Sequence, residues 1–488
     1  MQERTLMKRK NHLLAVALSA ILVSVAGCGG GGDDDNGNTG AAGNVDTSQL
    51  TDDALKTSIA SGLTKGITST TTTVSKVAQN SKAVKEVTGL TGRIQSRSLT
   101  VTKAAGDGFG FGDAGADDSD FDPASGLQVI NDIIEKSTVT KSGNTYTIDP
   151  DESTICSDPD MTAQEIQQCT DLLEDMIVVV EVKGVSGDQV TAATTQFQYK
   201  NATFVETDFT PTTAYYQVNL AGSKTLLTDI NNMAPAEDKF PVPEIMQGSL
   251  RIAADVPDEN RATVTLSIPD AIRLKSTTPG DELDLSLAAT DTVASLSADA
   301  STNRLDLEVG LNAVSALFPD EDAAGTFPVE FSLQALTGKF SVVDQGDDLQ
   351  ITGLGFDTVK LRVDNTEALS LQLDKLDAVL DASGTNAFVR IGKKLNFEMS
   401  TTNVRSYLDD SGSPTDTSSA SVGAPAGTEI AEADSEGNIL KVTAGGPLDI
   451  AITESGATPI NLSVQKDQCF DTDPDFGPMQ IVSCPAPK

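Results

Sequence analysis

Residues 262–268 read Ala-Thr-Val-Thr-Leu-Ser-Ile, so apolar and polar side chains alternate over the whole stretch. Successive side chains of a β-strand point to opposite faces, and this alternation therefore predicts a strand with one buried and one wet face. Antiparallel sheets commonly have that asymmetry, whereas strands of parallel sheets are usually apolar on both faces. The stretch favours an antiparallel sheet that is apolar on one side.

The same alternation recurs on both sides of this stretch, from about residue 189 to residue 404. Turn-prone residues separate the runs, and no long helical pattern interrupts them, which argues against a parallel βαβ fold. We predict a mainly β fold with a one-sided antiparallel sheet, closed as a sandwich or curved into a trough. With an N-terminal helical segment the chain is α+β overall. Further clear runs lie at 250–254, 283–287, 305–309, 331–335, 361–363 and 369–373.

Residues 46–90 have a helical pattern, in one piece or two, because apolar residues mostly recur at three- to four-residue steps. This stripe is Leu50, Leu55, Ile59, Leu63, Ile67, Val74, Val77, Val84 and Val87. The segment is locally basic, with Lys56, Lys65, Lys76, Lys82 and Lys85. Four placements stay open: on a membrane, on the acidic body, as a stalk, or packed on the sheet.

Local signals divide the rest of the chain. Residues 127–135 and 162–174 have helical patterns, and residues 138–148 have the pattern of a β-hairpin turning at Ser142-Gly143-Asn144. The predicted organisation is a signal peptide (1–27), a Gly/Asp tether (28–45), a helical segment (46–104), an acidic loop (105–126), an α+β region (127–236), an antiparallel β region (237–404), a linker or long loop (405–436) and a C-terminal β segment (437–488).

Composition excludes several classes of function. The chain has 34 Lys+Arg against 71 Asp+Glu, and such an acidic surface repels nucleic acids. Its single histidine is His12, inside the predicted signal, which excludes histidine-dependent catalysis and histidine metal ligands in the mature chain. Tryptophan is absent and tyrosine numbers 5, which disfavours a glycan-stacking cleft. We therefore expect a protein that is not an enzyme.

The N-terminus carries the most specific motif. A basic cluster, Lys8-Arg9-Lys10, precedes an apolar run from Leu13 to Val25, which is too short to span a bilayer. Val25-Ala26-Gly27-Cys28 closes the run and resembles the lipobox of bacterial lipoprotein precursors. The resemblance covers residues 1–28 only. It implies that Cys28 receives a diacylglycerol, becomes the first residue after cleavage and is usually N-acylated, for example with palmitate.

The same resemblance predicts a flexible tether and a cellular location. Residues 29–35 are four glycines and three aspartates, a flexible and solvated spacer. Gly29 after the cysteine resembles the outer-membrane default of lipoprotein sorting, so we expect a lipid-anchored protein of the bacterial cell envelope. Removing residues 1–27 takes away four basic residues and one acidic residue, which leaves a net charge of −40. The lipid, rather than the acidic body, is therefore expected to hold the protein at a membrane.

The four remaining cysteines are Cys156, Cys169, Cys469 and Cys484. An even number in an oxidising compartment predicts disulfides, for which three pairings exist. Proximity in the sequence favours Cys156 with Cys169 and Cys469 with Cys484, and each pair closes a short loop. A zinc site made of all four cysteines is the weaker alternative, because no CxxC knuckle is present.

Two acidic runs resemble cation-binding loops. Asp471, Asp473 and Asp475 alternate, as do Asp118, Asp120 and Asp122, and calcium loops use oxygen ligands at alternate positions. Calcium is the only cofactor we expect to be relevant; solvated acidic loops are the plainer interpretation. Residues 110–115 match GxGxxG without the preceding strand that dinucleotide binding needs. Ser463 and Lys466 have SxxK spacing at the end of a predicted strand, where that motif has no known use.

Three hypotheses for function remain. The first is a structural or binding lipoprotein whose one-sided sheet holds an acyl chain or another apolar ligand, or faces a surface protein. The second is a surface adhesin stiffened by calcium. The third is a hydrolase that uses carboxylates or a Ser-Lys pair. The sequence does not separate the first two hypotheses.

Overall fold

β-strands predominate in the computed structural model, which confirms the predicted mainly β, α+β class. The structure describes residues 45–48, 50–59, 134–157, 162–187, 189–233, 242–277, 283–318, 329–343, 348–363, 366–381, 389–392, 395–402, 417–434, 438–454, 456, 458–471 and 479–485. These residues form two compact units. Unit 1 contains the described residues up to 277 with Ala289–Asp291, and unit 2 contains Leu283–Ala288 and the chain from Thr292 onward.

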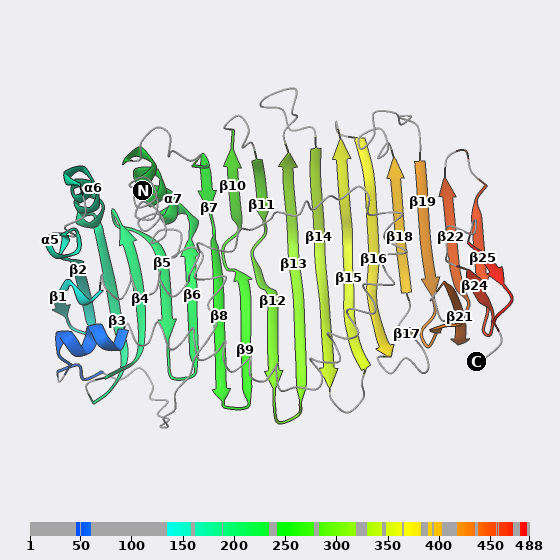
Figure 1. Cartoon of the computed structure of the whole chain (residues 1–488), viewed down its shortest axis with the longest axis horizontal. Helices are drawn as coiled ribbons and strands as arrows, with labels where there is room; N and C mark the ends of the chain where they lie inside the picture. Colours follow the sequence, from blue (N-terminus) through cyan, green and yellow to red (C-terminus); the bar gives the residue numbers. More distant parts are fainter. Residues whose placement is uncertain are drawn as a thin grey trace, which may run out of the picture. The chain divides into compact units, whose positions relative to one another are not determined.

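Unit 1 is built on an antiparallel sheet in which each strand mostly pairs with its neighbour in the sequence (Figure 1). The order β1–β2–β3–β4–β5–β6–β8–β9 follows from the pairings, and β7 pairs with β10. The strands are β1 Ser137–Ser142, β2 Thr145–Pro150, β3 Met176–Ser186, β4 Gln189–Tyr199, β5 Ala202–Phe209, β6 Thr213–Asn219, β7 Ile245–Gln247, β8 Ser249–Asp258, β9 Arg261–Ile268 and β10 Ile272–Ser276.

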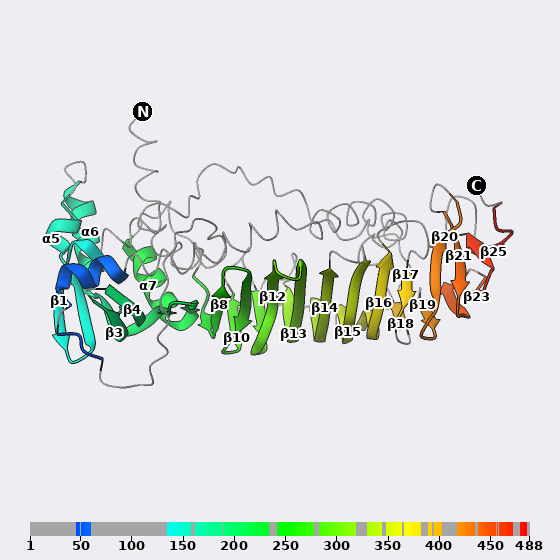
Figure 2. The same cartoon turned by 90° about the horizontal axis from the view of Figure 1, so that it is seen from below.

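Helices cover the apolar face of this sheet at its N-terminal strands (Figure 2). They are a helix over residues 52–59, α5 Glu152–Ile155, α6 Ala163–Glu174 and α7 Leu220–Met233. Leu55 and Ile59 have no exposed surface, like Val178 and Val180 of β3, so the first part of the predicted apolar stripe faces the core. None of the described helices is long and apolar enough to cross a bilayer.

Helix α7 corrects the expectation that no helix interrupts the strand region. Its Leu226 and Leu227 are buried and Ile230 packs against the same core, a helical spacing that the strand pattern on either side obscured. Gly222 lets the helix approach β5, since a Cβ there would collide with the Thr203 carbonyl oxygen. The sheet stays antiparallel because β8 returns beside β6 after the helix.

The opposite face of the unit 1 sheet is polar, and its side chains bond to one another. Asp208 accepts hydrogen bonds from Lys183 at 2.5 Å and from Thr194 at 2.7 Å. Tyr215 donates to Glu206 at 2.7 Å, and burial together with this bond raises the pKa of Tyr215. Period-two alternation in β3–β6 therefore separates a covered apolar face from a wet polar face, as predicted.

Unit 2 begins with β11 and β12, which pair with the two halves of the same edge of β13, and continues β13–β14–β15–β16. Beyond β16 the sheet forks, because β17 and β18 pair with different halves of β16. The bounds are β11 Leu283–Leu287, β12 Thr290–Asp299, β13 Arg304–Phe318, β14 Val329–Val343, β15 Asp348–Val363, β16 Thr366–Asp381, β17 Val389–Ile391, β18 Leu395–Thr402, β19 Thr417–Ala424, β20 Glu429–Glu432, β21 Ile439–Ala444, β22 Leu448–Glu454, β23 Ile460–Val464, β24 Cys469–Asp471 and β25 Gln480–Val482.

The fork gives the C-terminal part of unit 2 two layers. One branch runs β18–β19–β22–β23, and the other runs β17–β20–β21–β24–β25. A core of residues from both branches lies between them, including Ile450 of β22 and Val442 of β21 (Figure 2). The predicted sandwich therefore exists here. Among the described residues, β13–β16 form a single layer instead (Figure 2).

Two predicted boundaries are wrong. The linker predicted at 405–436 contains β19 and β20, because its run of Ser, Thr and Ala residues hides an alternating strand. Ala420 and Val422 of β19 pair with Ile452 and Ile450 of β22. The boundary predicted at residues 236/237 falls inside unit 1, since the alternating strands β8–β10 extend the first sheet.

Candidate functional site: the apolar face of the long strands

The long strands β13–β16 place rows of apolar residues opposite one another. Directly opposed residues of antiparallel strands project to the same face, so each row is a strip of apolar side chains across the sheet. One row runs Leu296–Leu307–Phe340–Ile351–Ala378. A second runs Leu287–Val314–Leu333–Val359–Leu371. We call the side of the sheet that carries these rows the apolar face.

Each long strand changes the phase of its alternation near the middle. Apolar residues step by three from Leu311 to Val314, from Leu333 to Leu336 and from Leu373 to Leu376. In a regular strand an odd step would move the later residues to the other face. Irregularities lie at these points, namely Ala335 with φ of 53°, Gly353 with φ of 62°, and register shifts in the β14–β15 and β15–β16 pairs.

The irregularities keep the apolar residues together, since a bulge re-aims the side chains that follow it. A Cβ built on Gly338 would lie 3.0 Å from Leu354 Cδ1 and 3.4 Å from Val309 Cγ2, so these residues share a face. Leu376, which follows the shift in β16, packs in the same cluster as Val422 and Ile450. Those two residues continue the row of Leu373, which precedes the shift.

The apolar face is only partly covered. Leu307 is 39 % exposed, and Leu296, Phe340, Leu333 and Val359 keep part of their surface accessible. Large apolar side chains scattered singly on a surface are ordinary, whereas a contiguous set is typical of an interaction site. The partly exposed rows therefore make this face a candidate interaction site.

The other face of the same strands is polar and carries the ion pairs. Asp306 of β13 lies 2.9 Å from Arg304 and 3.3 Å from Lys339. Lys360 of β15 lies 2.8 Å from Glu367 of β16. These charges are paired or hydrated on the polar face. The apolar face can therefore bind a partner mainly through dispersion and the hydrophobic effect.

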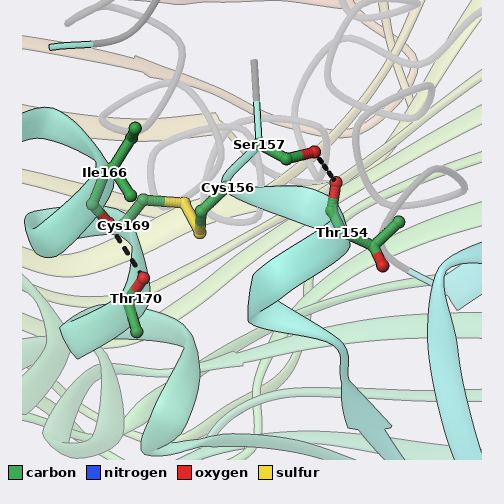
Figure 3. Close-up of a disulfide and its surroundings, with 6 residues drawn as sticks. All are labelled: Thr154, Cys156, Ser157, Ile166, Cys169 and Thr170. Atoms are coloured by element: carbon green, nitrogen blue, oxygen red, sulfur yellow. Dashed lines mark hydrogen bonds between the residues drawn. A yellow bond between two sulfur atoms is a disulfide. The ribbon is translucent and has the colours of Figure 1, made fainter. Parts of the chain in front are cut away.

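Both predicted disulfides are present. Cys156 and Cys169 have Cα atoms 5.8 Å apart, and Cys469 and Cys484 have Cα atoms 5.2 Å apart. The first bond joins the end of α5 to the middle of α6 (Figure 3), where Thr170 also donates to the Ile166 carbonyl. The second closes the C-terminal hairpin of β24 and β25, with Cys469 fully buried. The cysteines are engaged in these bonds, which overturns the alternative of a four-cysteine zinc site.

The calcium prediction stays a prediction. Asp471 ends β24 opposite Ile439 and Gln480, while Asp473 and Asp475 lie outside the described residues, as do Asp118, Asp120 and Asp122. In the described part of the chain no group of three or more His, Cys, Asp or Glu side chains is arranged to hold a metal ion.

Of the remaining motifs, some lie outside the described residues and one lies within them. Cys28 and the GxGxxG stretch at 110–115 lie outside the described residues. Ser463 lies inside β23 and donates to Asp449 on the neighbouring strand at 2.7 Å, and Lys466 follows the strand as an exposed residue. The serine therefore does not open a helix, as an SxxK nucleophile would.

The sequence analysis missed the phase changes in β13–β16, although three-residue steps between apolar residues are visible in these strands. It also gave no sign of which apolar rows would be covered. Comparison of the chain with protein-family models, with curated proteins and with solved structures found no match.

Proposed function

We propose that this protein is an exported lipoprotein, anchored through Cys28, that uses the apolar face of β13–β16 to bind an apolar ligand such as an acyl chain. The single observation behind the proposal is a contiguous set of partly exposed apolar rows on one side of a single-layer sheet. Such a face gains free energy when apolar surface leaves water, at about 25 cal/mol per Å².

A binding role fits the chemistry of the chain better than catalysis does. The mature chain has no histidine, and the Ser463 hydroxyl is hydrogen-bonded on a sheet face. The polar faces of both units pair their charges internally, as in Lys183–Asp208 and Arg304–Asp306. The outer membrane is the proposed location, because a lipid anchor would keep an acidic body close to a source of acyl chains.

The proposal is tested by titrating the mature protein with a fluorescent fatty acid in the absence of detergent. Leu307→Asp should weaken binding about tenfold, corresponding to about 1.4 kcal/mol of lost apolar contact. Glu308→Gln is the matched control on the polar face of the same strand and should bind like the original chain. Equal affinities for the two variants would place the ligand elsewhere.

The anchor has its own test. Cys28→Ala in the full chain should move the protein from the membrane fraction to the soluble fraction. Native mass spectrometry of that released protein, exported in its own host, should then detect a reproducible lipid adduct. Membrane attachment of the Cys28→Ala protein would contradict the anchor, and a bare mass would contradict a resident lipid.

A further inference from the structure

We propose that Arg251, on the polar face of the unit 1 sheet, binds the carboxylate group of a small monocarboxylic acid. The arginine lies in β8, and the residues that hold it lie in the neighbouring strand β6 (Figure 1). This inference goes beyond the proposed function and does not depend on it, because the apolar face of β13–β16 belongs to unit 2.

Arg251 differs from other arginines of this acidic chain in the partner of its guanidinium. It donates from Nε at 2.9 Å and from Nη2 at 2.6 Å to Oε1 of Gln217, which is a neutral amide oxygen. Among the described residues, no carboxylate lies within ion-pair distance of Arg251, so its positive charge is oriented without being neutralised. Other described arginines do lie beside carboxylates: Arg261 beside Asp258, Arg304 beside Asp306, Arg362 beside Glu330 and Arg390 beside Glu429.

Contacts with β6 fix the orientation of the guanidinium. Gln217 is 8 % exposed, and its Nε2 donates to Asn219 Oδ1 at 2.9 Å, so both ends of its amide are engaged. The Arg251 Cζ atom lies 4.4 Å from the centroid of the Tyr215 ring, and the Tyr215 hydroxyl is in turn bonded to Glu206. An arginine held on two sides loses little further side-chain freedom when a ligand binds, which lowers the entropic cost of binding.

The bonds to Gln217 occupy only one side of the guanidinium. Nε and Nη2 donate to the same oxygen, which leaves one donor on Nη2 and both donors on Nη1. Neighbouring donors on Nη1 and Nη2 form a fork that matches the two oxygens of a carboxylate. Ser267 lies opposite Arg251 in the β8–β9 pair, so its hydroxyl projects to the same face as a further donor.

The charge around this site favours a ligand with a single negative charge. Glu206 and Asp208 of β5 lie opposite Gln217 and Tyr215, on the same face of the sheet as Arg251. The chain as a whole has 71 Asp+Glu against 34 Lys+Arg. Repulsion by these carboxylates increases with the charge of the ligand, so a monocarboxylate is favoured over a phosphate dianion.

Modification of arginines by phenylglyoxal, followed by peptide mapping of the full-length mature protein, tests the proposal. Acetate should slow the modification of Arg251 in a concentration-dependent way, and sodium chloride of the same ionic strength should not. Arg261, already paired with Asp258, is the internal control and should react at the same rate with and without acetate. Inorganic phosphate should protect Arg251 less than acetate does. The absence of protection by acetate would overturn the proposal, and stronger protection by phosphate would overturn the choice of a carboxylate.

A charge-matched pair of variants tests the role of the free guanidinium. Gln217→Glu places a carboxylate where Arg251 now contacts an amide. It should slow the modification of Arg251 about tenfold and remove the effect of acetate, because hydrogen bonds to a charged acceptor are stronger. Gln198→Glu adds the same charge on β4, where Gln198 bonds to Gln196 rather than to Arg251, and should retain protection by acetate.

Protection that persists in Gln217→Glu would contradict the proposed site. The measurement on the unaltered chain needs no variant, so the proposal stays testable even if Gln217→Glu fails to fold. The fatty-acid titration reports separately on the apolar face of unit 2, and either proposal can therefore fail without the other.

Discussion

The two parts of unit 2 share one sequence pattern and differ in what covers it. In the C-terminal part the fork at β16 lays one branch over the other, and Val442, Val464 and Leu448 are at most 3 % exposed. Over β13–β16 the same alternation leaves Leu307 39 % exposed. Alternation therefore specifies which face is apolar, and the pairing of later strands specifies whether that face is buried.

Matched leucine substitutions are the sharpest way to break this comparison. Leu448→Ala removes a buried side chain between the two branches and should lower the free energy of unfolding by about 2–5 kcal/mol, from lost transfer energy and a cavity. Urea denaturation followed by circular dichroism measures the loss. A loss below 1 kcal/mol would mean that the two branches are not packed as a closed core.

Removing the second disulfide is a further test of the two-layer C-terminal part of unit 2. Replacing both Cys469 and Cys484 with Ala frees the hairpin of β24 and β25 and should cost about 3 kcal/mol, because the bond restricts the unfolded chain over a loop of 15 residues. Thermal unfolding of this variant beside the original chain gives the difference. An unchanged melting temperature would show that the hairpin contributes little to closing the sandwich.

A substitution in the single-layer part, β13–β16, should lower the free energy of unfolding much less. Leu307→Ala removes a side chain that already keeps 39 % of its surface exposed, so we expect a loss of about 1 kcal/mol or less. The same urea titration measures it. A loss as large as that of Leu448→Ala would mean that another element covers Leu307 in solution.

Unit 1 provides a third case, an apolar face that helices cover. The prediction there concerns how stability changes at high pH. Tyr199 of β4 donates to Asp229 of α7 at 3.0 Å, and burial followed by this hydrogen bond raises the pKa of Tyr199 to about 12. The unfolded state releases the proton near pH 10, so this contribution is present below pH 10 and is lost as the pH rises towards about 12.

Tyr199→Phe should therefore flatten the fall in melting temperature between pH 9 and pH 12 without abolishing it, because Tyr215 and Tyr216 also have raised pKa values. Scanning calorimetry across that range measures the slope. Identical slopes for the variant and the original chain would mean that the contact between Tyr199 and α7 does not contribute to the pH dependence of stability.

Local signals account for much of the fold. The strand at 262–268, the helix carrying Cys169 and the hairpin turning at Gly143 lie where the pattern predicts them. These features depend on neighbours within a few residues. β19 and α7 were missed for opposite reasons. Along β19, small Ser and Ala residues reduce the difference in hydropathy between successive positions. The three- to four-residue spacing of α7 is short and lies between strands with period-two alternation, which obscures it.

The candidate site was predicted less completely than the fold. The sequence identifies the leucine rows but not their alignment, because alignment depends on cross-strand register and on the irregularities at Ala335 and Gly353. The two disulfide pairings were predictable since each closes a short loop and proximity in the chain makes short loops the cheaper ones to close.

The sequence by itself determined the one-sided apolar pattern, the lipobox resemblance at Cys28 and the acidic charge, and it favoured the cysteine pairing that the structure has. These properties reside in single residues or in contacts between close neighbours along the chain. Only the tertiary structure decided that the sheet forks at β16 and that its apolar face is buried at one end and partly exposed over β13–β16. Burial depends on which distant strand returns to cover a face, and period-two alternation is the same for a strand that is covered and for one that is not.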